Sequence, residues 1–181
     1  MEGTAAPNWH ESITELWANA KGRDPDEVLA EIEKLVAGHE RDPLAAFELA
    51  GAYDYAGQEA RAEAPYRRAL SGGLDPEHHQ QAVIQLASTL RNLGRATEAA
   101  DLLWAELDST LVEPYAAAAR AFLALTLLDL GEERRAAVVA LEGLRDSLTT
   151  YAGPVGRYLD DVTSSDLDDE EEEEPPHVFN G

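Results

Sequence analysis

Two histidine-containing segments carry residue types that can bind metal ions. His10-Glu11 begins the pattern of a zinc protease, which needs a second His four residues after the first, but Thr14 occupies that position. His78 and His79 are adjacent, so on a helix they point about 100° apart instead of toward one ion. Neither segment therefore predicts a metal site.

The acidic stretch 161–172 begins with Asp and ends with Glu, as a calcium-binding loop does. It lacks acids at its third and fifth positions and has no central Gly, so we do not expect ordered calcium binding. The chain has no Cys, which excludes disulfides, thiolate metal ligands and a thiol nucleophile. No phosphate loop, nucleophile elbow or dinucleotide fingerprint occurs. The sequence therefore predicts a protein that is not an enzyme and uses no cofactor.

The formal net charge of −22 bears on the class of partner. A surface that binds nucleic acid must supply cations, so this charge argues against a nucleic-acid partner. No apolar run approaches the length of a membrane span, and the first residues show no basic, apolar signal, so we expect a cytoplasmic protein without a membrane partner. The basic residues are mostly Arg and Ala is abundant, a composition typical of a GC-rich bacterial genome.

An internal repeat organises the middle of the chain. Three segments, 49–70, 86–107 and 123–144, align without gaps at a spacing of 37 residues. Five columns agree in all three segments: the opening Leu-Ala, a Gly eight residues on, an Ala thirteen residues on and the closing Leu. Composition alone would give about one such column or fewer, so the segments are true repeats.

Each repeat has the signals of two antiparallel helices. Asp42-Pro43 and Asp75-Pro76 place an N-cap acceptor before a Pro at the first helical position, and Glu113-Pro114 is a weaker version. The shared Gly stands where the end of the first helix needs a residue that tolerates positive φ. We expect the shared small Ala where the two helices approach most closely.

This pattern resembles the tetratricopeptide repeat family. The first unit matches the family best, through Leu49, Ala50, Tyr53, Gly57, Ala62, Tyr66 and Ala69. The third unit departs from it at Ala140 and Gly143, and each junction is about three residues longer than is usual in the family. Segment 85–94 also looks like a small bacterial subgroup of these proteins. The resemblance covers 43–148 and implies an all-α fold, an α-solenoid of antiparallel helix pairs that binds other proteins and carries no catalytic residues.

Four regions follow from these patterns. We expect N-terminal capping helices over 1–41, three repeats over 42–148, a C-terminal capping segment over 149–162 and a disordered acidic tail over 163–181. In the first region, Trp9, Ile13, Leu16, Trp17 and Ala20 share one helical face; the two Trp residues form part of the core or, alternatively, an exposed stripe that binds a partner.

The first helix of the third repeat, 115–130, is apolar nearly all round. Leu123 and Leu127 lie on one side of it, and Leu125 and Leu128 lie on the other. Because such a helix is usually buried, we expect it to be covered on both faces. Segment 151–162 is the expected cover, and contact with a second copy of the chain would serve equally well.

A helical wheel gives the surface that binds a partner. When angles are counted from the Leu that opens each unit, positions between about 140° and about 240° face away from the second helix. The resemblance implies that these positions line a concave groove. The candidate partner-binding residues are Phe47, Asp54, Tyr55, Gln81, Ile84, Ser88, Arg91 and Asn92. Arg91 is the only basic residue on this face and is expected to pair either with a ligand carboxylate or with Asp54.

Some tetratricopeptide repeat proteins hold the free carboxylate of a chaperone tail with Lys, Asn and Arg at such positions. The residues at the corresponding places here are Phe47, Gly51, Gln81, Gln85, Ala118 and Phe122. This clamp is absent, so a chaperone tail is not the expected ligand.

The sequence therefore leaves two functions. The first is an adaptor that binds a protein or peptide partner in the groove. The second is a structural subunit that associates with itself through the third repeat, giving a homodimer or a larger oligomer.

Overall fold

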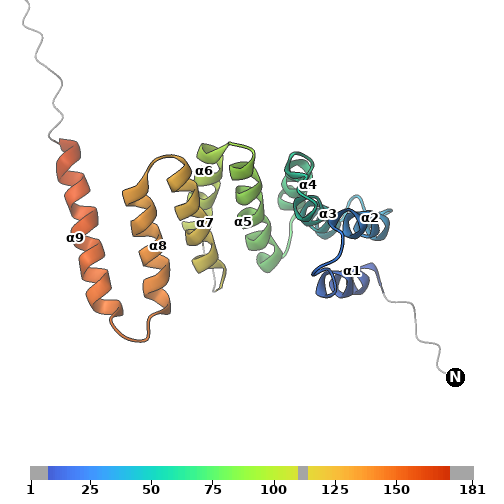
Figure 1. Cartoon of the computed structure of the whole chain (residues 1–181), viewed down its shortest axis with the longest axis horizontal. Coiled ribbons are helices and arrows are strands. Elements are labelled where there is room, and N and C mark those ends of the chain that lie inside the picture. The colour runs from blue at the N-terminus through green and yellow to red at the C-terminus, as the bar shows by residue number, and fades with distance from the viewer. Residues whose placement is uncertain (1–7, 110–113, 172–181) are drawn as a thin grey trace, which may run out of the picture.

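The computed structural model describes residues 8–109 and 114–171, except the side chains of 146 and 164–171, and its elements are all helices (Figure 1). None of the helices in these ranges is long and apolar enough to cross a membrane. The elements are α1 (Trp9–Ala18), α2 (Pro25–Val36), α3 (Pro43–Tyr55), α4 (Glu59–Gly72), α5 (Pro76–Asn92), α6 (Ala96–Leu107), α7 (Tyr115–Asp129), α8 (Glu133–Ser147) and α9 (Ala152–Glu171).

The helices stack in chain order into a single row. α3 and α4, α5 and α6, and α7 and α8 form the three repeats, and each helix packs on the next one along the chain. α1 and α2 precede the first repeat, with α2 against α3, while α9 stands at the other end of the row against α8 (Figure 1). The expected all-α solenoid of antiparallel helix pairs is confirmed.

Three helices begin with the same cap. The side chains of Asp24, Asp42 and Asp75 accept a hydrogen bond from the backbone N–H two residues on, and a Pro occupies the first helical position each time. Glu113 lies outside the described residues, and α7 begins after Pro114 without a side-chain cap. The local signals therefore place these helix starts correctly.

The turn inside each repeat is the same three times. Gly57, Gly94 and Gly131 have φ of +67°, +75° and +75°, as expected for the residue that ends the first helix. The residue after each Gly donates its backbone N–H to a carbonyl five positions earlier, at 2.8 to 2.9 Å. These bonds satisfy carbonyl groups at the helix end and reverse the chain direction.

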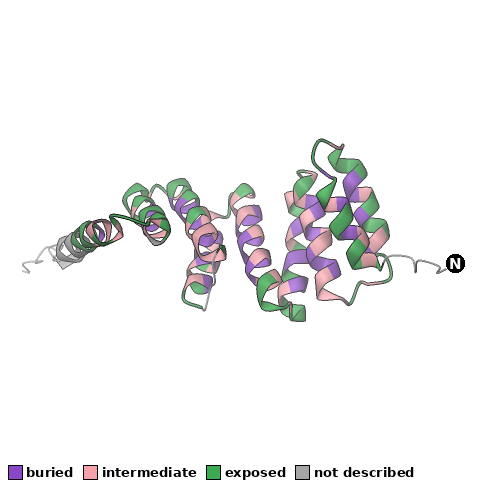
Figure 2. Ribbon diagram, turned by 90° about the horizontal axis from the view of Figure 1, so that it is seen from below, coloured by how far each residue is buried: buried purple, intermediate pink, exposed green. Residues whose placement is uncertain are grey.

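The core runs between the two helices of each repeat (Figure 2). Ala62, Ala99 and Ala136 are all buried at the helix contact, as expected. The opening Leu residues of the second and third repeats are buried as well, whereas Leu49 packs at the edge of the core.

The expectation that segment 151–162 covers the second face of α7 is wrong, while cover by a second copy of the chain stays a prediction. Leu123 and Leu127 are buried, but Leu125 is 42% exposed and Leu128 is 50% exposed. The expected cover, which lies in α9, packs on α8 and buries Leu159. Successive helices of a solenoid stack along its axis, so the segment after α8 joins the row and does not return across the open face of α7.

α9 also extends further than expected. It continues to Glu171 and so includes residues 163–171, which we expected to be disordered. A helix already begun in a packed segment propagates with little further cost, because each added residue gains a hydrogen bond. The rest of the acidic tail, 172–181, lies outside the described residues.

The one-sided burial of α7 predicts unequal effects for two adjacent leucines. Leu127 is 1% exposed, so Leu127→Ala should leave a cavity and lower the free energy of unfolding by about 2–5 kcal/mol. Leu128 is half exposed, so Leu128→Ala should change this free energy by about 0.5 kcal/mol or less. Urea denaturation followed by circular dichroism measures both values. Equal costs would mean that another surface covers Leu128 in solution.

Candidate partner-binding groove

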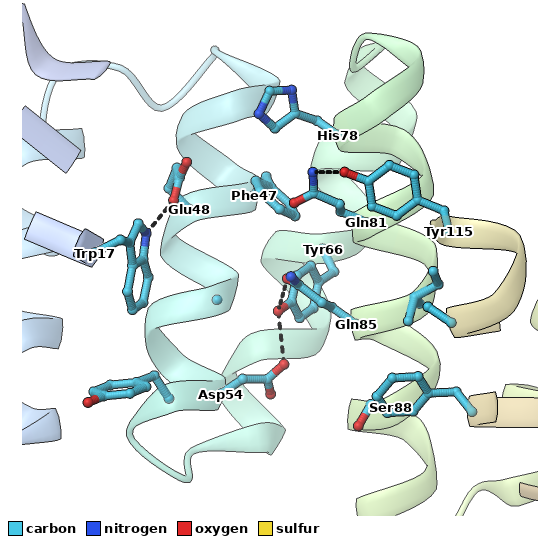
Figure 3. A pocket seen from close by; sticks show the side chains of 15 residues that line it. Trp17, Phe47, Glu48, Asp54, Tyr66, His78, Gln81, Gln85, Ser88 and Tyr115 are labelled. Carbon is cyan, nitrogen blue, oxygen red and sulfur yellow. Dashed lines mark hydrogen bonds between the residues drawn. The ribbon is translucent and has the colours of Figure 1, made fainter. Parts of the chain in front are cut away.

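The first helices of the three repeats line one cavity of about 760 Å³ (Figure 3). α3, α5 and α7 supply most of its side chains, α1 adds Trp17 and α4 adds Tyr66. The lining residues are Trp17, Phe47, Glu48, Gly51, Asp54, Tyr55, Tyr66, His78, Gln81, Ile84, Gln85, Ser88, Tyr115, Ala118 and Phe122. We call this cavity the groove.

The structure brings six of the eight candidate residues together in the groove: Phe47, Asp54, Tyr55, Gln81, Ile84 and Ser88. Arg91 and Asn92, near the end of α5, lie outside its lining. The lining ends at residue 55 on α3, at 88 on α5 and at 122 on α7, so the groove crosses the helices obliquely. Residues at equivalent wheel angles therefore do not all reach it.

The wheel missed lining residues on one side of its arc. Glu48, Gln85 and Phe122 precede the opening Leu of their units by one position, which places them at about 260° on the wheel. His78 and Tyr115 lie at about 280°. An arc wider by about 40° would have included all five residues. Trp17 and Tyr66 come from other helices. Trp9 and Trp17 are partly buried against the core, as the first of the two alternatives expected, and Trp17 also lines the groove.

A polar network fixes the floor of the groove. Tyr66, buried in α4, lies with its hydroxyl oxygen 2.9 Å from Asp54 Oδ2 and 2.9 Å from Gln85 Oε1 (Figure 3). The Thr89 hydroxyl donates to the same Asp54 oxygen at 2.7 Å. Burial raises the pKa of the Asp54 carboxyl, and the hydrogen bonds from Thr89 and Tyr66 oppose this shift only in part. The network ties α3, α4 and α5 together.

Glu48 joins the N-terminal helices to the groove. The indole Nε1–H of Trp17 donates to Glu48 Oε2 at 2.7 Å (Figure 3). Burial raises the pKa of the Glu48 carboxyl, while this hydrogen bond lowers it. The Tyr55 hydroxyl donates to the Ala20 carbonyl at 2.9 Å, so a second bond holds this wall in place.

Tyr115 connects α7 to α5 at the opposite wall. Its hydroxyl accepts from Gln81 Nε2 at 2.9 Å and donates to Glu77 Oε1 at 2.8 Å (Figure 3). The Gln81 side chain, which lines the groove, is thereby held against α7.

Arg91 does not pair with Asp54, which was one of the two partners expected for it. Its guanidinium forms an ion pair with Asp129, and Nη2 lies 3.4 Å from Asp129 Oδ1. Asp54 points instead into the network with Tyr66 and Thr89. Arg91 therefore links α5 to α7 beside the groove.

The charged side chains among the lining residues are acidic, apart from His78, and no Lys or Arg is among them. Elsewhere in the described ranges, no three His, Asp or Glu side chains gather in a way that could hold a metal ion. The groove is therefore an acidic surface with aromatic walls.

Comparison with known families gives a match to the Tetratrico peptide repeat family over residues 43–162. The match covers about two thirds of the chain. The chain belongs to this family. No curated protein matches it.

The family match extends past 148, where the resemblance in the sequence ended, and takes in the first half of α9. In this tetratricopeptide repeat protein, the six positions corresponding to the carboxylate clamp all line the groove, and none of them is basic. Aromatic, small and amide side chains thus occupy the positions of the clamp.

The raised pKa of Asp54 predicts how its replacement alters stability with pH. An Asp in the unfolded chain has a pKa of about 3.9, whereas the pKa of Asp54 in the folded chain is higher. Between these two pKa values the folded chain binds more protons than the unfolded chain. The contribution of Asp54 to the free energy of unfolding therefore falls as the pH rises through this range. Asp54→Asn removes this penalty and keeps an oxygen that accepts hydrogen bonds. We expect the variant to gain stability over the wild type as the pH rises from about 4 to about 7.

Urea denaturation at several pH values measures this gain. Asp101→Asn, at an exposed position on α6, serves as the control for the loss of one negative charge. The difference in the free energy of unfolding between Asp54→Asn and the wild type is corrected by that control. If this difference is the same at both ends of the pH range, Asp54 does not have a raised pKa.

Proposed function

We propose that this chain is a non-catalytic adaptor that binds a peptide segment of a partner protein in the groove. The observation that carries the proposal is the continuous cavity of about 760 Å³ across α1, α3, α5 and α7, with aromatic walls and polar groups held in place by hydrogen bonds. Recognition sites combine an apolar lining with a few fixed polar groups in this way. Repeats of this family generally mediate contacts between proteins, which supports the same proposal.

Within this proposal, the lining residues Phe47, Tyr55 and Ile84 supply apolar contact, and Gln81 and Ser88 offer hydrogen bonds. Asp54 supplies charge at the floor. Arg91 and Asn92 extend the contact beyond the rim, for a ligand longer than the groove.

Filling the groove should abolish partner binding. Ser88 is half-buried at the end of the lining on α5, and the large side chain of Ser88→Trp extends into space that the ligand needs. Ala105→Trp, at an exposed position on α6 outside the lining, is the matched control. Affinity capture from an extract of the native source, followed by mass spectrometry, should recover a partner with the wild type and Ala105→Trp but not with Ser88→Trp. Equal recovery with all three proteins would contradict the proposal.

A second candidate function is self-association, favoured by the surface at the C-terminal end. Of the eight large apolar side chains exposed in the described residues, seven lie after residue 124. They are Leu125, Leu128, Leu141, Leu144, Tyr151, Tyr158 and Val162. A concentration of this kind is characteristic of interaction surfaces, whereas isolated exposed apolar residues are ordinary.

Leu141 lies at the repeat position of Arg67 and Trp104. Arg67 on α4 pairs with Glu98 on α6, which is 31 residues later in the sequence. The Trp104 ring on α6 lies 5.7 Å from the guanidinium of Arg135 on α8, which is also 31 residues later. Leu141 is the next residue in this series, and its counterpart, 172, lies outside the described residues. An apolar side chain thus stands where the earlier repeats pair with their neighbours.

On this second proposal the protein has a mass in solution that is a multiple of 19.7 kDa and rises with concentration. The double variant Leu125→Gln with Leu128→Gln should lower that mass to the monomer value, because both side chains lie on the open face of α7. Ala105→Gln controls for the added polar groups. Light scattering after size-exclusion chromatography gives the masses, and a wild-type monomer at every concentration would exclude self-association.

A further inference from the structure

Two acids on α3 give the groove its charge. Glu48 and Asp54 are six residues apart, which places them about 9 Å apart along the helix axis. The other lining side chains are aromatic, apolar or neutral polar, except His78, whose Nδ1 is 2.5 Å from Asp75 Oδ2 outside the groove. No Lys or Arg of the described lining offsets the two carboxylates.

This charge lies at one end of the groove. The equivalent positions 48, 85 and 122 hold Glu, Gln and Phe, so α3 contributes an acid, α5 an amide and α7 an aromatic ring. The residues equivalent to Asp54 on α5 and α7 are Arg91 and Leu128, and both lie outside the lining. A ligand that lies along the groove therefore meets carboxylates over α3 and apolar side chains over α7.

One carboxylate oxygen at this end has no donor. The hydroxyl groups of Tyr66 and Thr89 both lie at Asp54 Oδ2, whereas Oδ1 is buried and receives no hydrogen bond from any described residue. A buried acceptor without a donor costs free energy, and the field of a nearby cation offsets part of that cost.

Aromatic rings surround the acidic end. Trp17 and Tyr55 meet edge to face with ring centroids 5.7 Å apart, and Phe47 lies on the same helix as the acids. Aromatic faces attract cations, and the attraction is stronger where water is displaced. Carboxylates and aromatic rings in one cavity thus favour the same kind of ligand group.

We infer that the groove recognises a peptide segment in which an Arg or Lys side chain lies beside apolar side chains, with the cation over α3 and the apolar part over α7. This inference rests on the proposed peptide-binding function and adds the chemistry of the ligand. The cation pairs with Glu48 and is attracted by the charge of Asp54, while Ile84, Tyr115 and Phe122 contact the apolar part.

Charge argues against the other occupants available. Residues 158–181 carry ten acids and no Lys or Arg, so the end of the chain would be repelled by Glu48 and Asp54. A second copy of the chain brings a further formal charge of −22. A basic partner, in contrast, is steered toward an acidic groove by its field.

The test uses the full chain and three libraries of capped octapeptides rich in Leu and Phe. The libraries differ in one residue, which is Arg, its neutral analogue citrulline, or Glu. Affinity selection on the wild-type chain picks the tightest Arg peptide. Isothermal titration calorimetry then compares that peptide with its citrulline and Glu counterparts.

Five protein variants locate the effect. Glu48→Gln combined with Asp54→Asn removes both charges but keeps oxygens that accept from Trp17, Tyr66 and Thr89. Asp101→Asn removes one acid outside the groove, and Ser88→Trp fills the groove. Glu48→Gln and Asp54→Asn are also measured as single variants. Circular dichroism checks that the double variant folds, and if it does not, the single variants still give a result.

We expect the Arg peptide to bind the wild type at least about tenfold more tightly than the citrulline peptide, with the Glu peptide weakest. The double variant should lose this preference, Asp101→Asn should keep it, and Ser88→Trp should bind none of the three peptides. Equal affinity of the Arg and citrulline peptides overturns cation recognition but leaves peptide binding in the groove standing.

A preference for Arg that persists in the double variant, or in Ser88→Trp, places the binding elsewhere and overturns the inference. Selection of no peptide from any library also overturns it. The capture experiment with Ser88→Trp decides separately whether the groove binds a partner protein at all, so failure of the inference and failure of the proposed function give different results.

Discussion

The reversal at Gly57, Gly94 and Gly131 is the constraint on which the rest of the structure depends. At φ of +67° to +75° a side chain would be strained, and only there does the chain turn sharply enough for the second helix to pack on the first. The second helix then covers one face of its partner, through Ala62, Ala99 or Ala136. The opposite faces of α3, α5 and α7 stay open side by side, and they form the groove.

The fold was largely predictable from sequence because its signals are local. An Asp before a Pro, a Gly at a helix end and a small Ala at a helix contact each act within a few residues, and their recurrence every 37 residues shows the repeat. The cover of α7 was not predictable in this way. Apolar residues such as Leu125 and Leu128 indicate that a face avoids water, but not which segment reaches it, and the stacking of α9 on α8 is decided by the row as a whole.

The sequence predicted which face of the helices carries the candidate site, but not which residues on that face line the groove. A wheel treats each helix alone, whereas the twist of the stack makes the groove cross α3, α5 and α7 at different heights. Arg91 and Asn92 were included for this reason, whereas Glu48 was missed because it lies at about 260° on the wheel, outside the arc. Trp17 and Tyr66 reach the groove from α1 and α4, and no periodicity within a repeat relates them to it. Their positions follow only from the packing of neighbouring helices.

The residues that give the groove its charge also hold its helices together. Asp54 connects α3 to α4 and α5 through Tyr66 and Thr89, and Glu48 connects α3 to α1 through Trp17. The second and third repeats hold Leu103 and Ala140 where the first holds Tyr66, so they have no hydroxyl to support such an acid. The buried columns of the repeat fix a common fold, and the groove columns differ freely. Three copies of one unit thereby produce a surface with different chemistry at its two ends.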